Sequence, residues 1–142
     1  LRALLADPAR VKLFHFARFD LAAISHYLEV TAAPVYCTKI ASRLTRTYTD
    51  RHGLKDLVRE VLNVDLSMQH QSSDWGADSL CEPQLAYAAS DVLHLHGLRE
   101  RLDAMLVREG RAALAKACFD FLPTRALLDL QGWAEEYIFA HS

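Results

Sequence analysis

The chain has 142 residues, of which 51% are hydrophobic and 24% are charged, and its 16 basic and 18 acidic residues give a net charge of −2. This composition predicts one soluble globular domain and excludes a disordered chain and a strongly basic nucleic-acid coat. Every apolar stretch is too short to span a bilayer, and Asp7 and Pro8 interrupt the region where a signal peptide would be apolar. The cysteines (Cys37, Cys81 and Cys118) are odd in number and form no CxxC pair, which argues against a disulfide framework and a zinc site. We therefore expect a cytoplasmic protein without a membrane segment.

The first half of the chain predicts alternating strands and helices. The apolar run VKLFHF at residues 11–16 predicts a buried strand, and residues 17–30 follow it with helical spacing of apolar side chains. Pro34 ends this helical region. A second strand is expected over 35–38 and a helix over 39–46. This order is typical of an α/β unit.

The middle of the chain predicts two further helices. Residues 54–64 show a strong amphipathic repeat, carried by Leu54, Leu57, Val58, Val61 and Leu62. The polar stretch at 65–79 predicts a long loop, and loops of that length tend to be functional. The longest helix is expected over 82–108, with Pro83 in its first turn and Gly110 as its stop.

The segment 111–142 carries too much apolar surface to be a loose tail. Pro123 and Gly132 are expected to divide it into short helical pieces, which cover the core or pair with another subunit. The sequence thus predicts a single domain over 1–142 whose helical tail forms an oligomer interface.

Three side chains are candidates for catalysis. Tyr87 and Asp91 are four residues apart on the longest helix, so a phenol and a carboxylate project from one face. Asp20 follows the first strand near a helix start. Taken alone, these residues are also typical of a surface pair and of a helix cap.

The segments KLFHFARFDLAAI, GLKDLVREVL, QSSDW and LAYAASDVLHL occur in this order and cover most of residues 11–110. In this they resemble the RNase D branch of the 3′-5′ exonucleases, which use four acidic residues and a tyrosine. The resemblance implies an RNase H-like (DnaQ-like) exonuclease fold of the α/β class. The acid of the second motif falls on Asp20, and the Tyr-x-x-x-Asp of the third motif falls on Tyr87 and Asp91.

Such a resemblance implies a two-metal phosphodiesterase. Asp20 and Asp91 would be both catalytic residues and ligands of Mg²⁺ or Mn²⁺, because hard divalent cations prefer carboxylate oxygens. Tyr87 would orient the attacking water by hydrogen bonding.

The first motif of the family, an Asp-x-Glu on an early strand, has no counterpart, since no Asp in the chain is followed two residues later by Glu. Two of the four carboxylates are therefore absent. The chain looks like a family member without its first strands and with a helix-rich carboxyl-terminal part. We expect it to be inactive or nearly so by itself.

A closer resemblance, to the single-domain nanoRNase C (NrnC) diribonuclease family, is carried by TKIASRLTRTYTDRHGLK, by AKACFDFLP and by the ending IFAHS. It implies a cytoplasmic homo-oligomeric ring that splits RNA dinucleotides and short RNA 3′ ends into mononucleotides. Two alternatives stay open: RNase D-like trimming of longer structured RNA, and a non-catalytic module that binds RNA ends or assembles.

Several further residues are candidates for substrate contacts. The window from Lys39 to Lys55 carries a net charge of +4, which is typical either of a solvated helix face or of a phosphate-binding surface. The candidates are His15, Arg43, Arg46, Arg51, Gln71, Ser72 and Trp75. For the three arginines the expected ligand is a terminal phosphate. His15 is more typical of a packed, hydrogen-bonded core histidine than of a substrate contact, and Trp75 is equally typical of a core anchor.

Overall fold

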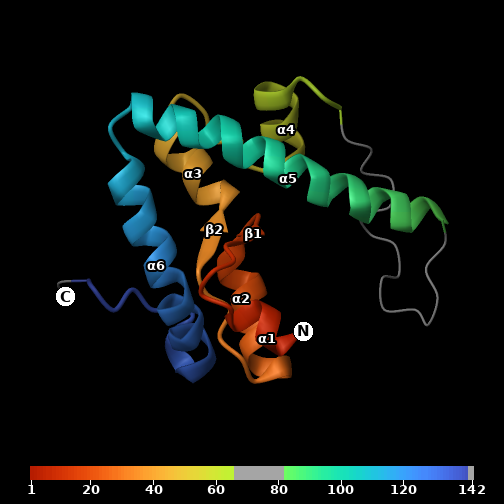
Figure 1. The fold of residues 1–142 in the computed structure, drawn as a ribbon. Coiled ribbons are helices and arrows are strands. Elements are labelled where there is room, and N and C mark those ends of the chain that lie inside the picture. The colour runs from red at the N-terminus through yellow and green to blue at the C-terminus, as the bar shows by residue number, and fades with distance from the viewer. Residues whose placement is uncertain (66–81, 141–142) are drawn as a thin grey trace.

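The computed structural model describes residues 1–65 and 82–140, with the side chains of 82–93 left out of the description. Figure 1 shows its secondary-structure elements in chain order. They are α1 (Arg2–Ala6), β1 (Lys12–Phe14), α2 (Ala17–Leu28), β2 (Val35–Cys37), α3 (Thr38–Thr45), α4 (Leu54–Leu62), α5 (Glu82–Arg108), α6 (Ala112–Leu128) and the π-helical turn η1 (Asp129–Trp133).

The two strands pair in parallel, and α2 forms the connection between them. Lys12 lies opposite Val35 and Phe14 opposite Cys37. Both predicted strands are confirmed, although each is shorter than its apolar run. All three residues of β2 are buried, whereas those of β1 are only partly buried. A strand, a crossover helix and a parallel strand are the unit from which α/β sheets are built.

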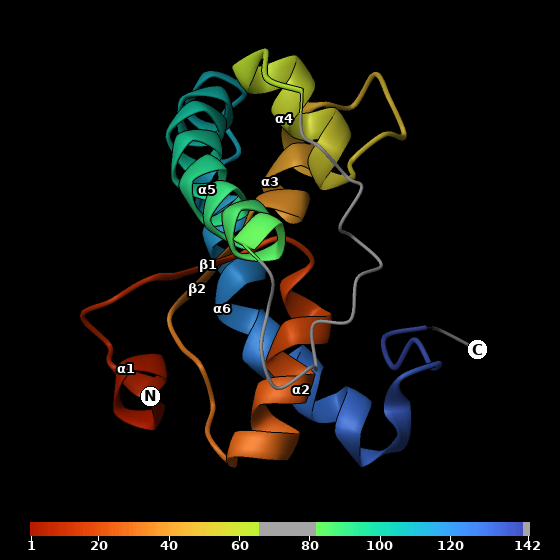
Figure 2. The same cartoon turned by 90° about the vertical axis from the view of Figure 1, so that its right-hand side faces the viewer.

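The helices surround this small sheet (Figures 1 and 2). Helix α5 crosses one end of the molecule and packs on α3 and α4, while α6 runs alongside α2 and contacts β2. The two longest helices thereby enclose the sheet from two sides. Among the described residues, no helix combines the length and apolar character needed to cross a membrane.

The core forms where α5 and α6 meet the sheet and the shorter helices. Leu98 and Leu102 of α5 are fully buried, as are Leu57 and Val58 of α4. Their burial confirms that the predicted apolar faces of α4 and of the described part of α5, residues 94–108, point inward. Burying one such leucine contributes about 2 kcal/mol. Packing therefore holds α5 and α4 together.

Gly110 ends α5 as the sequence predicts. Its φ of 69° lies in the left-handed region, which glycine adopts without strain. The amide of Gly110 donates to the carbonyl of Val107 at 3.1 Å, and that of Arg111 donates to the carbonyl of Leu106 at 2.8 Å. These two bonds form a Schellman motif, which satisfies the last carbonyls of the helix.

The predicted division of the tail at Pro123 is wrong, because α6 runs through that residue. Proline removes one backbone hydrogen bond, but Phe119, Leu122 and Ala126 on the same helix are buried against the rest of the molecule. This burial outweighs the local cost. The division at Gly132 is confirmed, since its φ of 107° ends the helical geometry. Helix α1 was not predicted, and none of its residues is buried.

Candidate functional site

Asp20 lies in the first turn of α2, directly beyond β1, where the sequence predicts it. Burial raises the pKa of its carboxyl group above the ordinary value. Salt bridges and hydrogen bonds between described residues do not involve this carboxylate. A partly buried carboxylate that has no partner among the described side chains fits the chemistry of a divalent-cation ligand, because burying an unpaired charge is costly.

Helix α2 begins beside an exposed aromatic cluster that sequence reasoning missed. Phe16 has a φ of 65°, an uncommon conformation for a residue with a side chain, and its ring is 49% exposed. It stacks on the exposed ring of Phe19, with 6.4 Å between centroids and 8° between planes. The ammonium group of Lys39 lies 4.4 Å from the Phe16 centroid. The sequence signal for this cluster is the spacing of the phenylalanines in FHFARF. From the sequence alone, these residues are interpreted as the apolar side chains of a strand and of the helix that follows it.

Tyr87 and Asp91 both lie within α5, so their spacing of four residues falls on a continuous helix as expected. Their side chains are outside the described part, as are residues Gln71, Ser72 and Trp75 altogether. The meeting of Asp20 with Asp91 therefore stays a prediction. Within the ranges whose side chains are described, no three potential ligands gather into a metal-binding group.

His15 is held in the interior. Its Nδ1 lies 2.8 Å from Oγ1 of Thr38, which itself donates to the carbonyl of Phe14 at 3.2 Å. The Thr38 hydroxyl therefore accepts from Nδ1–H, which leaves Nε2 as a buried acceptor without a hydrogen-bond partner in the described structure. Burial, with Lys39 nearby, lowers the pKa of His15 to about 4. The ring is neutral at pH 7.

This lowered pKa predicts an acid-sensitive fold. The unfolded chain takes up a proton at His15 near pH 6.5 and the folded chain only near pH 4, so protonation favours unfolding throughout that window. The free energy of unfolding should fall by up to about 3 kcal/mol as the pH drops from 7 to 4. Urea unfolding measured across this range checks the prediction.

The matched variants are His15→Asn, which keeps a donor for Thr38 but cannot be protonated, and His26→Asn at an exposed position. His15→Asn should flatten the stability profile, whereas His26→Asn should leave it unchanged. An identical slope in His15→Asn would show that other groups control acid sensitivity, such as buried His52, whose pKa is also lowered by burial.

Arg46 has an internal role. Its side chain is 3% exposed and forms an ion pair with Glu60. It also donates to Oγ of Ser42 at 2.9 Å and to the carbonyl of Arg51 at 2.7 Å. A guanidinium group with all these partners is not available to a phosphate. The geometry therefore favours a structural function for Arg46 in place of the substrate contact expected from sequence.

Arg43 faces a different environment. It is exposed and lines a cavity of about 360 Å³ between α2, α3 and α6, together with Phe16, Ala17, Arg18, Cys37, Lys39, Ile40, Leu122 and Arg125. Lys39 and Arg43 have no acidic partner among the described side chains. Arg51 lies elsewhere, beside an open hollow with Tyr48 and Arg59. The structure thus places Arg43 apart from Arg46 and Arg51, and Arg43 is the one near Asp20's helix.

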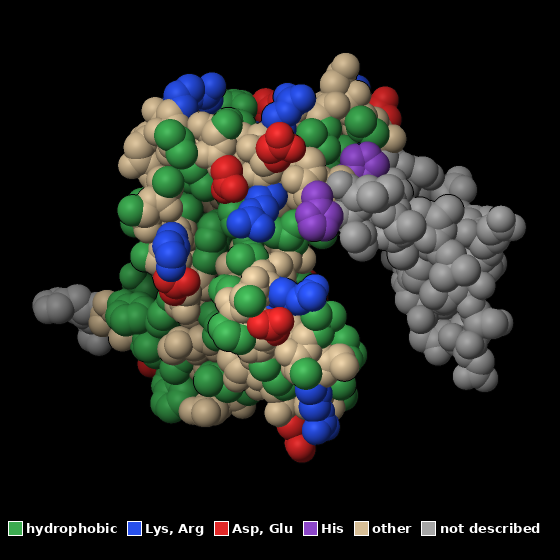
Figure 3. Space-filling model, in the orientation of Figure 1, with side chains coloured by type: hydrophobic (Ala, Val, Ile, Leu, Met, Phe, Trp, Pro, Cys, Tyr) green, Lys and Arg blue, Asp and Glu red, His purple; other side chains and the backbone are tan. Residues whose placement is uncertain are grey.

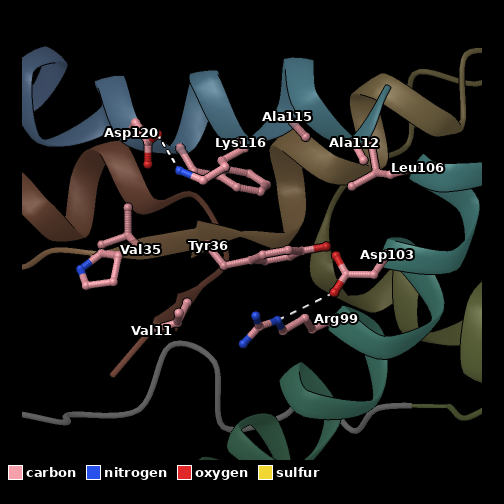
Figure 4. Close-up of a pocket in the computed structure, with 12 residues that line it drawn as sticks. Val11, Val35, Tyr36, Arg99, Asp103, Leu106, Ala112, Ala115, Lys116 and Asp120 are labelled. Atoms are coloured by element: carbon pink, nitrogen blue, oxygen red, sulfur yellow. Dashed lines mark hydrogen bonds and ion pairs between the residues drawn. The ribbon is translucent and has the colours of Figure 1, made fainter. Parts of the chain in front are cut away.

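A second cavity, of about 240 Å³, lies between β2, α5 and α6 (Figure 4). The ring of Tyr36 forms its floor, between Phe119, 4.5 Å away by centroids, and the guanidinium group of Arg99, 5.2 Å away. Arg99 pairs with Asp103 at 3.6 Å. Burial raises the pKa of Tyr36, so its phenol stays protonated. Tyr36 and Cys37 point to opposite faces of the strand, which places this cavity away from Arg43.

The face shown in Figure 3 has no continuous basic stripe among the described residues, because Lys and Arg alternate there with Asp, Glu and apolar side chains. The basic residues between Lys39 and Lys55 are divided between two hollows, because Lys39 and Arg43 line the cavity beside α2 whereas Arg46 and Arg51 line the one with Tyr48. Any anion-binding function depends on individual cations such as Arg43.

Comparison with known proteins identifies the family. The family model described as 3′-5′ exonuclease matches residues 1–107. The chain belongs to the 3′-5′ exonuclease family. The ribonuclease D of Gluconacetobacter diazotrophicus is 38% identical over 111 residues, which are 78% of this chain and 28% of that protein. The chain thus spans 28% of that relative's length and well under half of the length of the other curated ribonuclease D relatives.

Solved structures of the exonuclease family confirm the fold. A nuclease in its apo form is 64% identical with a TM-score of 0.94, and the match covers 99% of this chain and 68% of that one. Brucella melitensis NrnC with bound Mg²⁺ is 58% identical with a TM-score of 0.92 and the same coverage. Escherichia coli RNase D, at 24% identity and a TM-score of 0.79 over 94% of this chain and 36% of that one, shares the fold. The predicted RNase H-like α/β exonuclease fold and the resemblance to NrnC are both confirmed.

Proposed function

We propose that the chain forms part of a metal-dependent 3′-5′ exoribonuclease that cleaves RNA dinucleotides and short oligoribonucleotides to mononucleotides. The observation that carries the proposal is Asp20, a partly buried carboxylate without a described partner, placed where the second motif of the family has its acid. The Brucella melitensis NrnC solved with pGG is 58% identical over 99% of this chain, which supports a short oligonucleotide as substrate.

Asp20 and Asp91 would hold the divalent cations. When bound, Mg²⁺ or Mn²⁺ would supply Lewis-acid stabilisation of the charge that develops on the phosphodiester. The Asp20 carboxylate fits this role because burial disfavours its charge in the absence of a cation. Tyr87, one helical turn before Asp91, would orient the attacking water through its hydroxyl group.

The remaining substrate contacts would come from the cavity beside α2. Arg43 and Lys39 supply positive charge for a phosphate, and the exposed ring of Phe16 offers a face on which a base can stack. Arg51, Gln71, Ser72 and Trp75 stay predicted contacts. His15 would act indirectly, through Thr38 at the start of α3.

We also propose that the protein forms a homo-oligomer in the cytoplasm. The tail leaves large apolar side chains exposed, which are Leu130, Trp133, Tyr137, Ile138 and Phe139. Such a group of exposed apolar residues is typical of a protein interface. A ring of copies would cover it. RNase D-like trimming of longer RNA is the alternative, and it requires an open groove in place of a short pocket.

A timed digestion of 5′-labelled RNAs of two to seven nucleotides in Mn²⁺ tests the proposal. The protein for this test is the complemented chain, meaning residues 1–142 preceded by the Asp-x-Glu segment of a family member. Dinucleotides should disappear fastest, and Asp91→Ala should abolish the reaction. Trimming of long RNAs while dinucleotides persist would establish the RNase D-like alternative.

The 142-residue chain without that segment is the second arm of the same experiment. Because it holds only two of the four expected carboxylates, we expect it to cleave no dinucleotide at a measurable rate. Rapid Mn²⁺-dependent cleavage by this chain alone would contradict the proposed division of the site.

A further inference from the structure

The carboxylate of Asp129, in the π-helical turn η1, binds two arginines from different helices. Its Oδ2 accepts from Nε of Arg18 at 2.7 Å, and its Oδ1 accepts from Nη2 of Arg18 at 2.7 Å and from Nη2 of Arg125 at 2.9 Å. The Asp129 side chain is 15% exposed. These hydrogen bonds lower its pKa. The two parallel bonds to Arg18 fix both distance and orientation.

The same guanidinium groups also hold the backbone of the tail. Arg18 donates to the carbonyl of Ala134 at 2.8 Å, and Arg125 donates to the carbonyl of Trp133 at 2.8 Å. The end of η1 leaves such carbonyls without helical partners. Arg18 therefore joins the first turn of α2 to a segment more than 110 positions later in the chain. An exposed pair such as Lys116 and Asp120, within α6 alone, makes no such connection.

The first turn of α2 has little local support. No side chain caps its amino terminus, and the residue before it, Phe16, is in the left-handed conformation. The amide of Ala17 donates to Sγ of Cys37 at 3.4 Å, and a thiol sulfur is a weak acceptor. A turn without a cap frays unless tertiary contacts hold it. The strongest polar contact available is the one between Arg18 and Asp129.

We infer that Asp129 is a positioning residue for Asp20. Asp20 lies in the same turn as Arg18, two residues later, so the clamp fixes where the Asp20 carboxylate stands. A displacement of about 1 Å at a reacting centre can cost about a hundredfold in rate. This inference rests on the proposed function, because it assigns Asp129 a purpose through the metal-ligating role of Asp20.

The experiment compares Asp129→Asn, Arg18→Ala and the double variant in the complemented chain, with Asp120→Asn as the matched control. Asp120→Asn also removes an acid from an ion pair with a basic residue, but at an exposed position on α6. Three quantities are measured: kcat on a dinucleotide, the Mn²⁺ concentration that gives half-maximal binding, and hydrogen exchange at the amides of residues 17–21. Urea unfolding provides the stability of each variant.

We expect Asp129→Asn to lower kcat about tenfold, to raise the Mn²⁺ midpoint about fivefold and to speed exchange at residues 17–21 about tenfold. KM should change little in Asp129→Asn, because Asp129 itself does not line the cavity proposed for the substrate. The double variant should lose no more than either single variant, and Asp120→Asn should match the parent. Unchanged exchange and Mn²⁺ midpoint in Asp129→Asn would overturn the inference, even if overall stability fell.

Failure of the proposed function would look different. In that case the parent itself would cleave no RNA, while hydrogen exchange and Mn²⁺ binding would still report whether Asp129 holds the first turn of α2. A parent that binds no Mn²⁺, with exchange at residues 17–21 unaffected by Asp129→Asn, would overturn both.

Discussion

Replacing Asp20 with asparagine is expected to lower dinucleotide cleavage by the complemented chain at least about a thousandfold. Asparagine keeps the shape of the side chain but removes the charge that would hold a divalent cation. When several residues act as one catalytic unit, the loss of one of them removes most of the activity. The measurement is the initial rate in Mn²⁺ and in Mg²⁺.

Stability should move in the opposite direction. Burial raises the pKa of Asp20, which means that the folded chain disfavours its charge without a cation. The neutral amide removes that cost, so the free energy of unfolding without metal should be equal or higher. Such a gain at the cost of activity is a mark of a functional residue. It would exclude misfolding as the cause of lost cleavage.

Asp56→Asn is the matched control, since Asp56 also lies in the first turn of a helix, α4. An acid there interacts favourably with the helix dipole, worth a few tenths of a kcal/mol. Cleavage should be unchanged and stability slightly lower. Equal activity of Asp20→Asn and the parent would contradict the assignment of Asp20 as a metal ligand.

The fold could be predicted from the sequence where periodicity and packing agree. The repeat in residues 54–64 and the stripe along 82–108 each mark one apolar face, and these faces are buried in α4 and in the described part of α5, residues 94–108. The helix break predicted at Pro123 is wrong, because the local tendency of proline to end a helix does not take account of what the helix packs against. Helix α6 passes through that proline since its neighbours on the same face are buried.

The site could be predicted only where the sequence resembles a motif of the family residue by residue. Asp20 was placed in that way, and the structure puts it at the start of α2. The contacts of Arg46 and Asp129 could not be predicted, because each depends on a partner brought close by the fold: Glu60 for Arg46, and Arg18 for Asp129. A run of basic residues says how many charges there are, but not which of them have partners.

Replacing Arg46 with alanine is expected to lower the stability of the fold strongly. The guanidinium group of Arg46 is buried and binds Glu60, Oγ of Ser42 and the carbonyl of Arg51. Removing it takes a donor from Ser42 and from the carbonyl of Arg51 and leaves Glu60 with only the hydroxyl of Tyr48 among its described partners, so the free energy of unfolding should fall by about 2 to 3 kcal/mol. Ser42 would also lose Arg46 as a hydrogen-bond donor. With Arg46 present, the Ser42 hydroxyl accepts from Arg46 and is free to donate to Nδ1 of His52, 2.7 Å away. Urea unfolding at pH 7 measures the loss.

Arg43→Ala is the matched comparison, because Arg43 lies one turn earlier on α3 and is exposed. Its removal should change stability by less than about 0.5 kcal/mol. It should instead weaken dinucleotide binding about tenfold, or about 1.4 kcal/mol, because one cation facing the cavity beside α2 is lost. Arg46→Ala should bind the dinucleotide with parental affinity once the folded fraction is taken into account.

Two arginines three residues apart, Arg43 within α3 and Arg46 directly after its last residue, thus separate two explanations of the same basic segment. If the segment were only a solvated surface, neither substitution would affect dinucleotide binding, and both would change the free energy of unfolding only slightly. If every cation bound phosphate, both would weaken binding alike. The structure predicts a third pattern, in which Arg46 controls stability and Arg43 controls affinity, because only Arg46 has its charge balanced by Glu60 inside the fold. Loss of affinity in Arg46→Ala with full stability would contradict this division.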